Sequence, residues 1–195
     1  LHWEDAAANL QMFEAKIAAI TTPKQIVILP EMFTTGFSMQ PQKLAETMNG
    51  LTVNWMLRMA QQHRIIIAGS VMIRENDVFY NRFLWVQPNG QIHSYDKRHL
   101  FAYGGEHEHY TPGNERIIVQ ANGWKILLQI CYDLRFPVWA RQQPNNILYD
   151  AIIYVANWPE RRSHAWRTLL QARAIENQCY VIGVNRVGND GNGIP

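Results

Sequence analysis

The sequence has few cysteines, little excess charge of either sign and no long hydrophobic run. Its two cysteines stand far apart, at positions 131 and 179, which argues against a disulfide framework and against a paired-cysteine zinc site. The formal net charge is +2 without a basic block, so we predict no nucleic-acid partner. Hydrophobic residues make up 47% and charged residues 17% of the 195 residues, a composition typical of one globular domain.

The apolar stretches are too short for a membrane protein. One of the longest, "IIIAGSVMI" at 65–73, is far shorter than the roughly 20 residues that a spanning helix needs. The start, "LHWEDAAANLQMF", carries acidic residues and lacks the order of a signal peptide. We therefore predict no membrane partner and a reducing, cytoplasmic location. The missing initial Met and the final loop "GNDGNGIP" predict that both ends are cut from a larger domain.

Alternating apolar runs and amphipathic segments predict an α/β protein with helices layered over sheet. Residues 5–20 and 51–63 carry apolar side chains at helical spacing. Two β-rich runs flank Pro88-Asn89-Gly90, and this turn sequence predicts a hairpin over 77–97. Further strands are expected at 25–30, 64–73, 116–120, 124–130, 151–156 and 179–185, and further helices near 135–143 and at 163–178. Residues 98–115 form a long polar loop of the kind that is often functional.

Reactive or polar side chains follow four of the predicted strands. Glu31 comes after "VILP" and Lys97 after the hairpin. Cys131 comes after "ILLQI", and Asn157-Trp158 come after "IIYVA". Sites in open α/β sheets gather at the carboxyl ends of strands, so these side chains are candidates for one site.

Three of these residue types together suit acyl transfer. A cysteine thiolate is a strong nucleophile, and a nearby base or cation makes it available. Glu31 is a candidate for the base, because partial burial of a carboxylate raises its pKa toward neutral pH. Lys97 is a candidate for holding the oxyanion, together with a backbone N–H just after Cys131. The chemistry so predicted runs through a thioester.

Three motifs of the sequence resemble the signatures of a known family. They are "LPEMFTTGF" (29–37), "YDKRHLF" (95–101) and "CYDLRFP" (131–137), and the segment 156–191 matches the same family. The chain is thus similar to the nitrilase superfamily, the carbon–nitrogen hydrolases, over essentially its whole length. The resemblance implies Cys131 as nucleophile, Glu31 as general base, and Lys97 with the Tyr132 N–H as the groups that hold the oxyanion.

The family often has a second glutamate between the lysine and the cysteine. In "GEHEHYTPG" (105–113) Glu106 is the better match and Glu108 the alternative. The same segment and "NWPERRSHAW" look most like the omega-amidase branch, which hydrolyses the terminal amide of 2-oxoglutaramate or 2-oxosuccinamate. Small-molecule amide and water would then be the partners of the site, with no cofactor and no metal, since the thiolate and fixed dipoles supply nucleophile and electrophile.

The resemblance also implies a fold and an assembly. The family fold is a four-layer αββα sandwich that dimerises, so we expect a homodimer. Residues 1–195 would form a single carbon–nitrogen hydrolase domain that lacks the usual first strand and the C-terminal elements.

Several alternatives stay open at this stage. Cys131 alone reads as a buried thiol, and Glu31 and Lys97 alone read as surface charges, as most such residues are. Phe37 and Trp158 either line a substrate pocket or belong to the core. The histidines of 99–109 form only a weak metal-binding pattern. The reaction could instead be that of a nitrilase, an N-carbamoylase or an aliphatic amidase, and the chain could be a non-catalytic interaction subunit.

Overall fold

The strands of the chain form two four-stranded sheets that pack face to face. In the computed structural model, which describes residues 1–143, 145 and 147–195, the first sheet has the order β1-β2-β3-β4 and the second the order β5-β6-β7-β8. The strands are β1 (Ile26–Ile28), β2 (Ile66–Glu75), β3 (Val78–Val86), β4 (Ile92–Asp96), β5 (Ile118–Ala121), β6 (Trp124–Ile130), β7 (Ala151–Ala156) and β8 (Tyr180–Asn185). Both sheets are mixed: β1 runs parallel to β2, and β6, β7 and β8 run parallel to one another, whereas the hairpin pairs are antiparallel.

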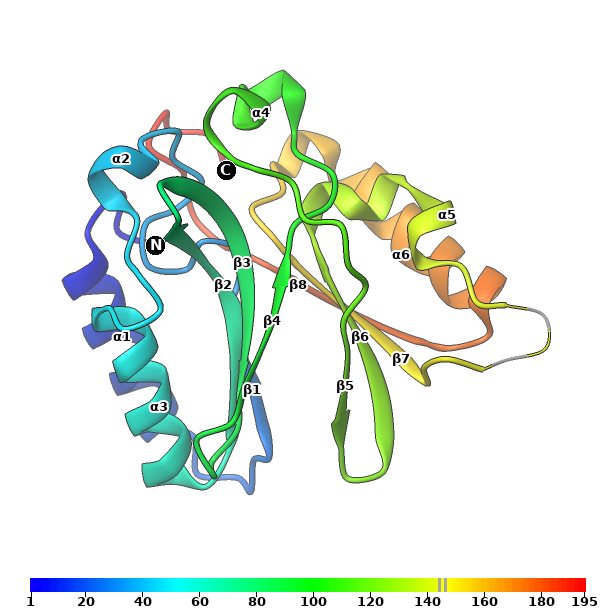
Figure 1. Ribbon diagram of the computed structural model, residues 1–195, viewed down its shortest axis with the longest axis horizontal. Coiled ribbons are helices and arrows are strands. Elements are labelled where there is room, and N and C mark those ends of the chain that lie inside the picture. Colours follow the sequence, from blue (N-terminus) through cyan, green and yellow to red (C-terminus); the bar gives the residue numbers. More distant parts are fainter. Residues whose placement is uncertain (144, 146) are drawn as a thin grey trace.

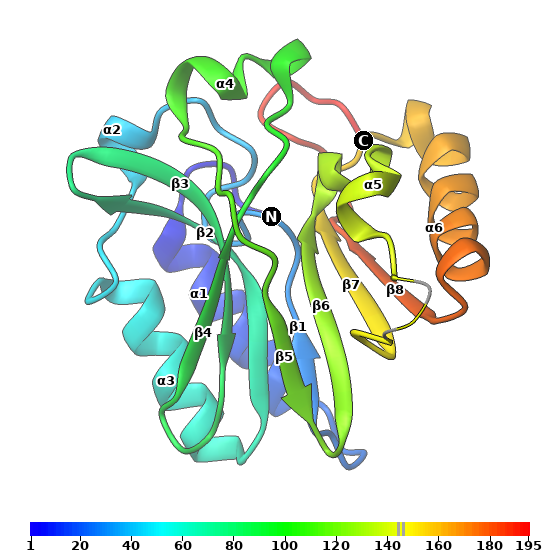
Figure 2. The same ribbon diagram turned by 45° about the vertical axis from the view of Figure 1, so that its right-hand side comes forward.

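Helices cover the two outer faces of this pair of sheets. The α-helices are α1 (Ala6–Ala18), α2 (Pro41–Leu44), α3 (Leu51–His63), α4 (Glu106–His109), α5 (Pro137–Ala140) and α6 (Ser163–Asn177), and the 3-10 helices are η1 (Ala102–Gly104), η2 (Cys131–Arg135) and η3 (Glu160–Arg162). Figures 1 and 2 show α1 and α3 outside the first sheet and α5 and α6 outside the second. The layers are therefore α, β, β and α, which confirms the predicted sandwich.

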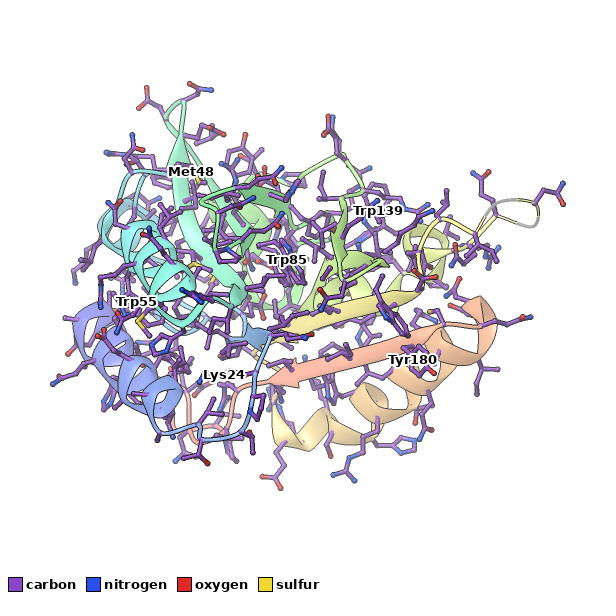
Figure 3. The ribbon with its side chains drawn as sticks, turned by 90° about the horizontal axis from the view of Figure 1, so that it is seen from below. Lys24, Met48, Trp55, Trp85, Trp139 and Tyr180 are labelled. Carbon is purple, nitrogen blue, oxygen red and sulfur yellow. The ribbon has the colours of Figure 1, made fainter. Side chains whose placement is uncertain are left out.

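Apolar burial holds these layers together. Between the sheets, Trp85 and Phe83 of β3 pack in one cluster with Leu128 and Ile130 of β6, and Trp85 lies near the centre of the molecule in Figure 3. A second cluster joins the inner faces of α1 and α3 to the outer face of the first sheet. Each fully buried side chain of this size stabilises the fold by about 1.5–3 kcal/mol.

Local sequence explains where several elements begin and end. The Asp5 carboxylate accepts a hydrogen bond of 2.9 Å from the Ala8 N–H and caps α1. Helix α3 has the predicted bounds 51–63 and ends where Arg64 takes a left-handed conformation with φ 52°. The predicted hairpin is present as β3 and β4.

Two predictions about local elements were wrong in detail, and one short helix was missed. The helix expected near 135–143 is shorter, because Arg141 is already extended and the Gln142 N–H donates to Asn177 on α6 instead of continuing the helix. The loop 98–115 contains η1 and α4, which are too short for helical periodicity to show. Helix α2 was not predicted for the same reason.

No helix in the part of the chain that the structure describes is long and apolar enough to cross a bilayer. The homodimer, the cytoplasmic location and the missing terminal elements stay predictions.

Candidate active site

Glu31 lies in a tight turn after β1, at one end of the first sheet. The residue after it, Met32, has a left-handed φ of 44°, and the Met32 N–H donates to Ser70 Oγ on β2 at 2.8 Å. This turn directs the Glu31 side chain inward, where it is 0% exposed. A buried carboxylate requires hydrogen-bond donors, and the neighbouring elements supply them.

Lys97 follows β4 directly and is the cation of the site. It is fully buried, and its Nζ donates to Glu31 Oε1 at 2.8 Å, to Glu106 Oε1 at 3.0 Å and to Glu106 Oε2 at 2.8 Å. Burial alone would lower the pKa of Lys97, but the negative charges of Glu106 and Glu31 outweigh it and raise that pKa. Lys97 is therefore a permanent cation held between two carboxylates.

Glu106 is the second carboxylate of this cluster. It opens α4 and is 0% exposed, whereas Glu108, two residues further along the chain, is on the surface. The Phe101 N–H donates to Glu106 Oε2 at 2.6 Å. Burial raises the pKa of Glu106, Lys97 lowers it, and Glu31 raises it again, with a net rise. The structure thus brings Glu106, and not Glu108, into contact with Lys97.

Cys131 lies at the junction of β6 and η2. Ile130 still has extended backbone geometry, whereas Cys131 has a left-handed φ of 43°, so the chain turns sharply at the thiol. Burial raises the pKa of the Cys131 thiol, the negative charge of the nearby Glu31 raises it further, and Lys97 lowers it in part. At rest the sulfur is therefore a thiol with a carboxylate base beside it.

Asp133 fixes the turn that carries Cys131. Its carboxylate accepts hydrogen bonds from the Ile130 N–H at 3.0 Å, the Tyr95 hydroxyl at 2.8 Å and the His99 N–H at 2.9 Å. Tyr95 and His99 belong to β4 and to the loop after Lys97. One buried carboxylate thus connects the lysine segment of the first sheet to the cysteine turn of the second.

A pocket of about 660 Å³ opens beside Cys131. Its lining includes Glu31, Cys131 and the two aromatic residues that the sequence suggested, Phe37 and Trp158. The Phe37 ring lies 5.2 Å from Lys97 Nζ, and the Trp158 ring lies 5.1 Å from the guanidinium carbon of Arg135. Both aromatic residues therefore line the pocket, and Trp158 also belongs to the buried cluster between the sheets.

Tyr132 follows the nucleophile candidate in the first turn of η2. Backbone N–H groups in a first helical turn have no partner within the helix, so this N–H is available to an oxyanion. The Tyr132 side chain lines the pocket and lies edge-on to Phe101, with ring centroids 5.1 Å apart.

One residue of the site, Asn81, escaped the sequence analysis, and a second, Asn157, was marked only by its place after a strand. Asn81, on β3, donates from Nδ2 to Glu31 Oε1 at 2.9 Å and to Glu106 Oε1 at 3.0 Å. The Asn157 backbone N–H donates to Glu31 Oε2 at 2.8 Å, and the Asn157 side chain donates to the Glu31 carbonyl oxygen. The position of Asn157 after a strand was a usable signal, whereas Asn81 lies inside a strand and gave none.

The histidines of the loop do not converge with the acidic cluster. His99 contacts Asp133 and stacks on Phe136, with ring centroids 3.8 Å apart, and His107 is exposed. Among the described residues, no group of three or more His, Cys, Asp or Glu side chains has the arrangement of a metal site.

Gly113 lets the loop approach the strand end that carries Lys97. Its N–H donates to the Lys97 carbonyl oxygen at 2.9 Å, and a Cβ at this position would lie 2.3 Å from the Asp96 carbonyl oxygen. We predict that Gly113→Ala lowers the free energy of unfolding in urea by about 1–3 kcal/mol, because backbone atoms must move. Asn114→Ala, at the exposed neighbouring position, is the control and should change it by less than about 0.5 kcal/mol. Equal values for the two variants would contradict this packing argument.

The sequence of the chain is similar to a known protein family and to known amide hydrolases. The model of the family described as carbon-nitrogen hydrolase matches residues 2–195. The chain is 51% identical over 193 residues to omega-amidase YafV of Escherichia coli (strain K12), covering 99% of this chain and 73% of that protein. It is 35% identical over 188 residues to 2-oxoglutaramate amidase of Bacillus subtilis (strain 168), covering 93% of this chain and 71% of that protein.

The fold of the chain is also similar to that of solved structures. The crystal structure of a CN-hydrolase superfamily protein from Xanthomonas campestris superimposes with a TM-score of 0.94 at 46% identity, covering 98% of this chain and 74% of that one. That protein carries an arsenic adduct in its active site.

Proposed function

Because the chain belongs to the carbon–nitrogen hydrolase family, we propose that it is an omega-amidase that works through a thioester on Cys131. Its substrates would be small 2-oxo dicarboxylate monoamides such as 2-oxoglutaramate and 2-oxosuccinamate, and its products the acid and ammonia. The substrate class is supported by the likeness to an omega-amidase and to a 2-oxoglutaramate amidase.

One observation carries the mechanism. Lys97 bridges two buried carboxylates, and one of these, Glu31, lines the same pocket as the thiol of Cys131. Burying two carboxylates and one ammonium group costs several kcal/mol per ion before their mutual attraction is counted. Such an arrangement is costly for stability alone, which favours a catalytic role.

In the first half-reaction the Cys131 sulfur attacks the amide carbonyl carbon while its proton moves to Glu31. The negative charge that develops on the carbonyl oxygen is held by Lys97 and by the Tyr132 N–H. All three ammonium hydrogens of Lys97 are directed at carboxylate oxygens, so one of the two contacts with Glu106 is given up for the oxyanion. The C–N bond then breaks, the nitrogen takes the proton from Glu31, and ammonia leaves.

In the second half-reaction a water molecule enters the position that ammonia has left. Glu31 takes a proton from the water as its oxygen attacks the thioester carbon. The same donors hold the second oxyanion, the C–S bond breaks, and the proton returns to sulfur. Glu106 stays outside the bond changes and keeps Lys97 in place, because it accepts two of the three lysine hydrogen bonds.

The lining of the pocket suits a small anionic amide. Beyond the thiol lie aromatic side chains, and the lining also includes four arginines and two acidic residues besides Glu31: Arg135, Arg161, Arg162, Arg186, Glu4 and Asp190. A 2-oxo acid amide presents its amide to Cys131 at one end and a carboxylate at the other. Arginine side chains are suited to carboxylates because their planar N–H groups bind both oxygens.

We predict that the chain releases ammonia from 2-oxoglutaramate with a kcat/KM at least about 100-fold above that for butyramide, which lacks the oxo acid end. A coupled ammonia assay measures both substrates. A nitrile and an N-carbamoyl amino acid, assayed in parallel, distinguish the other reactions of the superfamily. No ammonia from 2-oxoglutaramate, with turnover of another substrate, would overturn the substrate proposal and leave the thiol mechanism in place.

A further inference from the structure

Asn81 lies beside Lys97 because of the pairing of β3 with β4. The register pairs Arg82 with Asp96, so the next residues along, Asn81 and Lys97, are neighbours across the strand pair. The Lys97 N–H donates to the Asn81 carbonyl oxygen at 3.0 Å, and the Asn81 side chain is 0% exposed. Its amide is therefore fixed in the protein interior, and Asn81 is not among the described residues that line the pocket.

The amide of Asn81 bridges the same two carboxylates that Lys97 bridges. Its Nδ2 group donates to Glu31 Oε1 at 2.9 Å and to Glu106 Oε1 at 3.0 Å. Both of these oxygens also accept from Lys97 Nζ, at 2.8 Å and 3.0 Å. The orientation of the amide is fixed by this contact, because the reversed amide would direct its carbonyl oxygen at two carboxylate oxygens.

The charge of the cluster explains why a neutral donor is needed here. Glu31 and Glu106, both fully buried, share the single positive charge of Lys97. Two buried carboxylates that share one cation favour the uptake of a proton. A primary amide supplies two N–H donors without adding charge, and here each carboxylate accepts one of them. Neither an acid nor an apolar side chain of this size can do the same.

We propose that Asn81 is a positioning residue, which holds the carboxylates of Glu31 and Glu106 side by side against Lys97 so that Glu31 can act as the base toward Cys131. This inference rests on the proposed function for its turnover test. It assigns a role that neither Glu31 nor Lys97 can fill, since each of them is a charged partner in the reaction.

The consequence of losing the amide has a definite sign. The groups facing the two carboxylates are Lys97, Cys131 beyond the end of β6, and the largely buried Tyr110 after α4. Asn81→Leu leaves all of these in place and removes only the two N–H donors. A carboxylate that loses donors binds a proton more readily, so its pKa rises. Since the base acts only when ionised, the acidic limb of the pH–rate profile moves to higher pH.

The test uses the full chain with Asn81→Leu and Asn81→Asp, and with Leu84→Ala as a matched control. Leu84 lies on the same strand, is equally buried and packs toward α3 rather than toward the acids. Two rates are measured from pH 5 to pH 9: kcat/KM for 2-oxoglutaramate, and the alkylation of Cys131 by iodoacetamide, followed by peptide mass spectrometry. Circular dichroism reports folding of each variant.

For Asn81→Leu we expect kcat at neutral pH to fall roughly 10–100-fold with KM within about threefold. In both pH–rate profiles the midpoint of the acidic limb should move to higher pH by about one unit. Asn81→Asp adds a third carboxylate, so its limbs should shift in the same direction and further. Leu84→Ala should lose stability but keep the acidic limbs of both pH–rate profiles at the wild-type pH.

The inference would be overturned if a folded Asn81 variant kept the acidic limbs of both pH–rate profiles at the wild-type pH. So would a failure of both Asn81 variants to fold while Leu84→Ala folds, because Asn81 would then be a folding residue only. Alkylation needs no amide substrate. A wild-type chain that turns over no amide, yet shows the alkylation shift between wild type and Asn81→Leu, would overturn the proposed function and support this inference.

Discussion

Replacement of Cys131 by alanine is expected to lower kcat for amide hydrolysis by about 10⁴-fold or more. The thioester cannot form without the sulfur, and direct attack by water would have to use a site arranged for a different nucleophile. The fold should survive, because Cys131 is a small side chain at a turn that Asp133 holds through its own hydrogen bonds. The measurement is ammonia release from 2-oxoglutaramate by wild type and by Cys131→Ala at equal concentration.

Cys179 provides the matched control within the same chain. It is half-buried beside β8, and burial raises the pKa of its thiol to about 11. Cys179→Ala should therefore keep wild-type turnover. Both thiols have pKa values above the ordinary range, but Cys131 shares its pocket with the carboxylate of Glu31, whereas Cys179 lines a different pocket. Retained activity in Cys131→Ala, or its loss in Cys179→Ala, would contradict the proposed mechanism.

Thiol labelling separates an enzyme from an interaction subunit that merely keeps the fold. In an enzyme with Glu31 as the base, a small electrophile should react at Cys131 before Cys179, and Glu31→Gln should remove this preference. An inert subunit should show no preference between the two thiols. The family match favours the enzyme, and a carbon–nitrogen hydrolase acting on amides is what the comparisons confirm.

The order of elements could be predicted because the relevant signals are local. The Asn89-Gly90 turn fixes the hairpin of β3 and β4, and the spacing of apolar residues fixes α3. The layered α/β arrangement follows from the alternation of buried strands and helices. The αββα sandwich itself came from the family resemblance, and the two packed sheets with outer helices confirm it.

The candidate site could be predicted where its residues follow strand ends or fall within motifs that resemble those of the family, as Glu106 does. Glu31, Lys97 and Cys131 stand at such places and carry recognisable motifs. Asn81 lies inside β3 between Tyr80 and Arg82, and its partners are set by strand register and by a loop 25 residues away. The contribution of Asn157 to Glu31 comes partly from its backbone N–H, which no side-chain pattern reveals. Contacts of this kind depend on tertiary packing, so a single sequence does not display them.

Lys97→Met is expected to damage both catalysis and stability. Removing a cation that holds the oxyanion should lower kcat by roughly 10²–10³-fold, the usual effect of deleting one such donor. The same change leaves Glu31 and Glu106 buried without their counter-ion, which should cost about 3–5 kcal/mol of folding free energy at neutral pH. Lys16→Met, an exposed Lys-to-Met change on α1, is the control and should change neither quantity appreciably.

The stability loss in Lys97→Met should depend on pH in one direction. Burial and Glu31 raise the pKa of Glu106 even with Lys97 present, and removal of the cation raises it further. The folded chain then binds more protons than the unfolded chain, so its stability falls as pH rises from the unfolded pKa of a carboxyl through the folded one. The gap in unfolding free energy between wild type and Lys97→Met should therefore narrow as pH is lowered toward 5. Urea unfolding at several pH values measures this gap. A gap that is constant or widens in acid would mean that the two glutamates are not the ionised partners of Lys97, and both the base and the ion-bridge assignments would have to be abandoned.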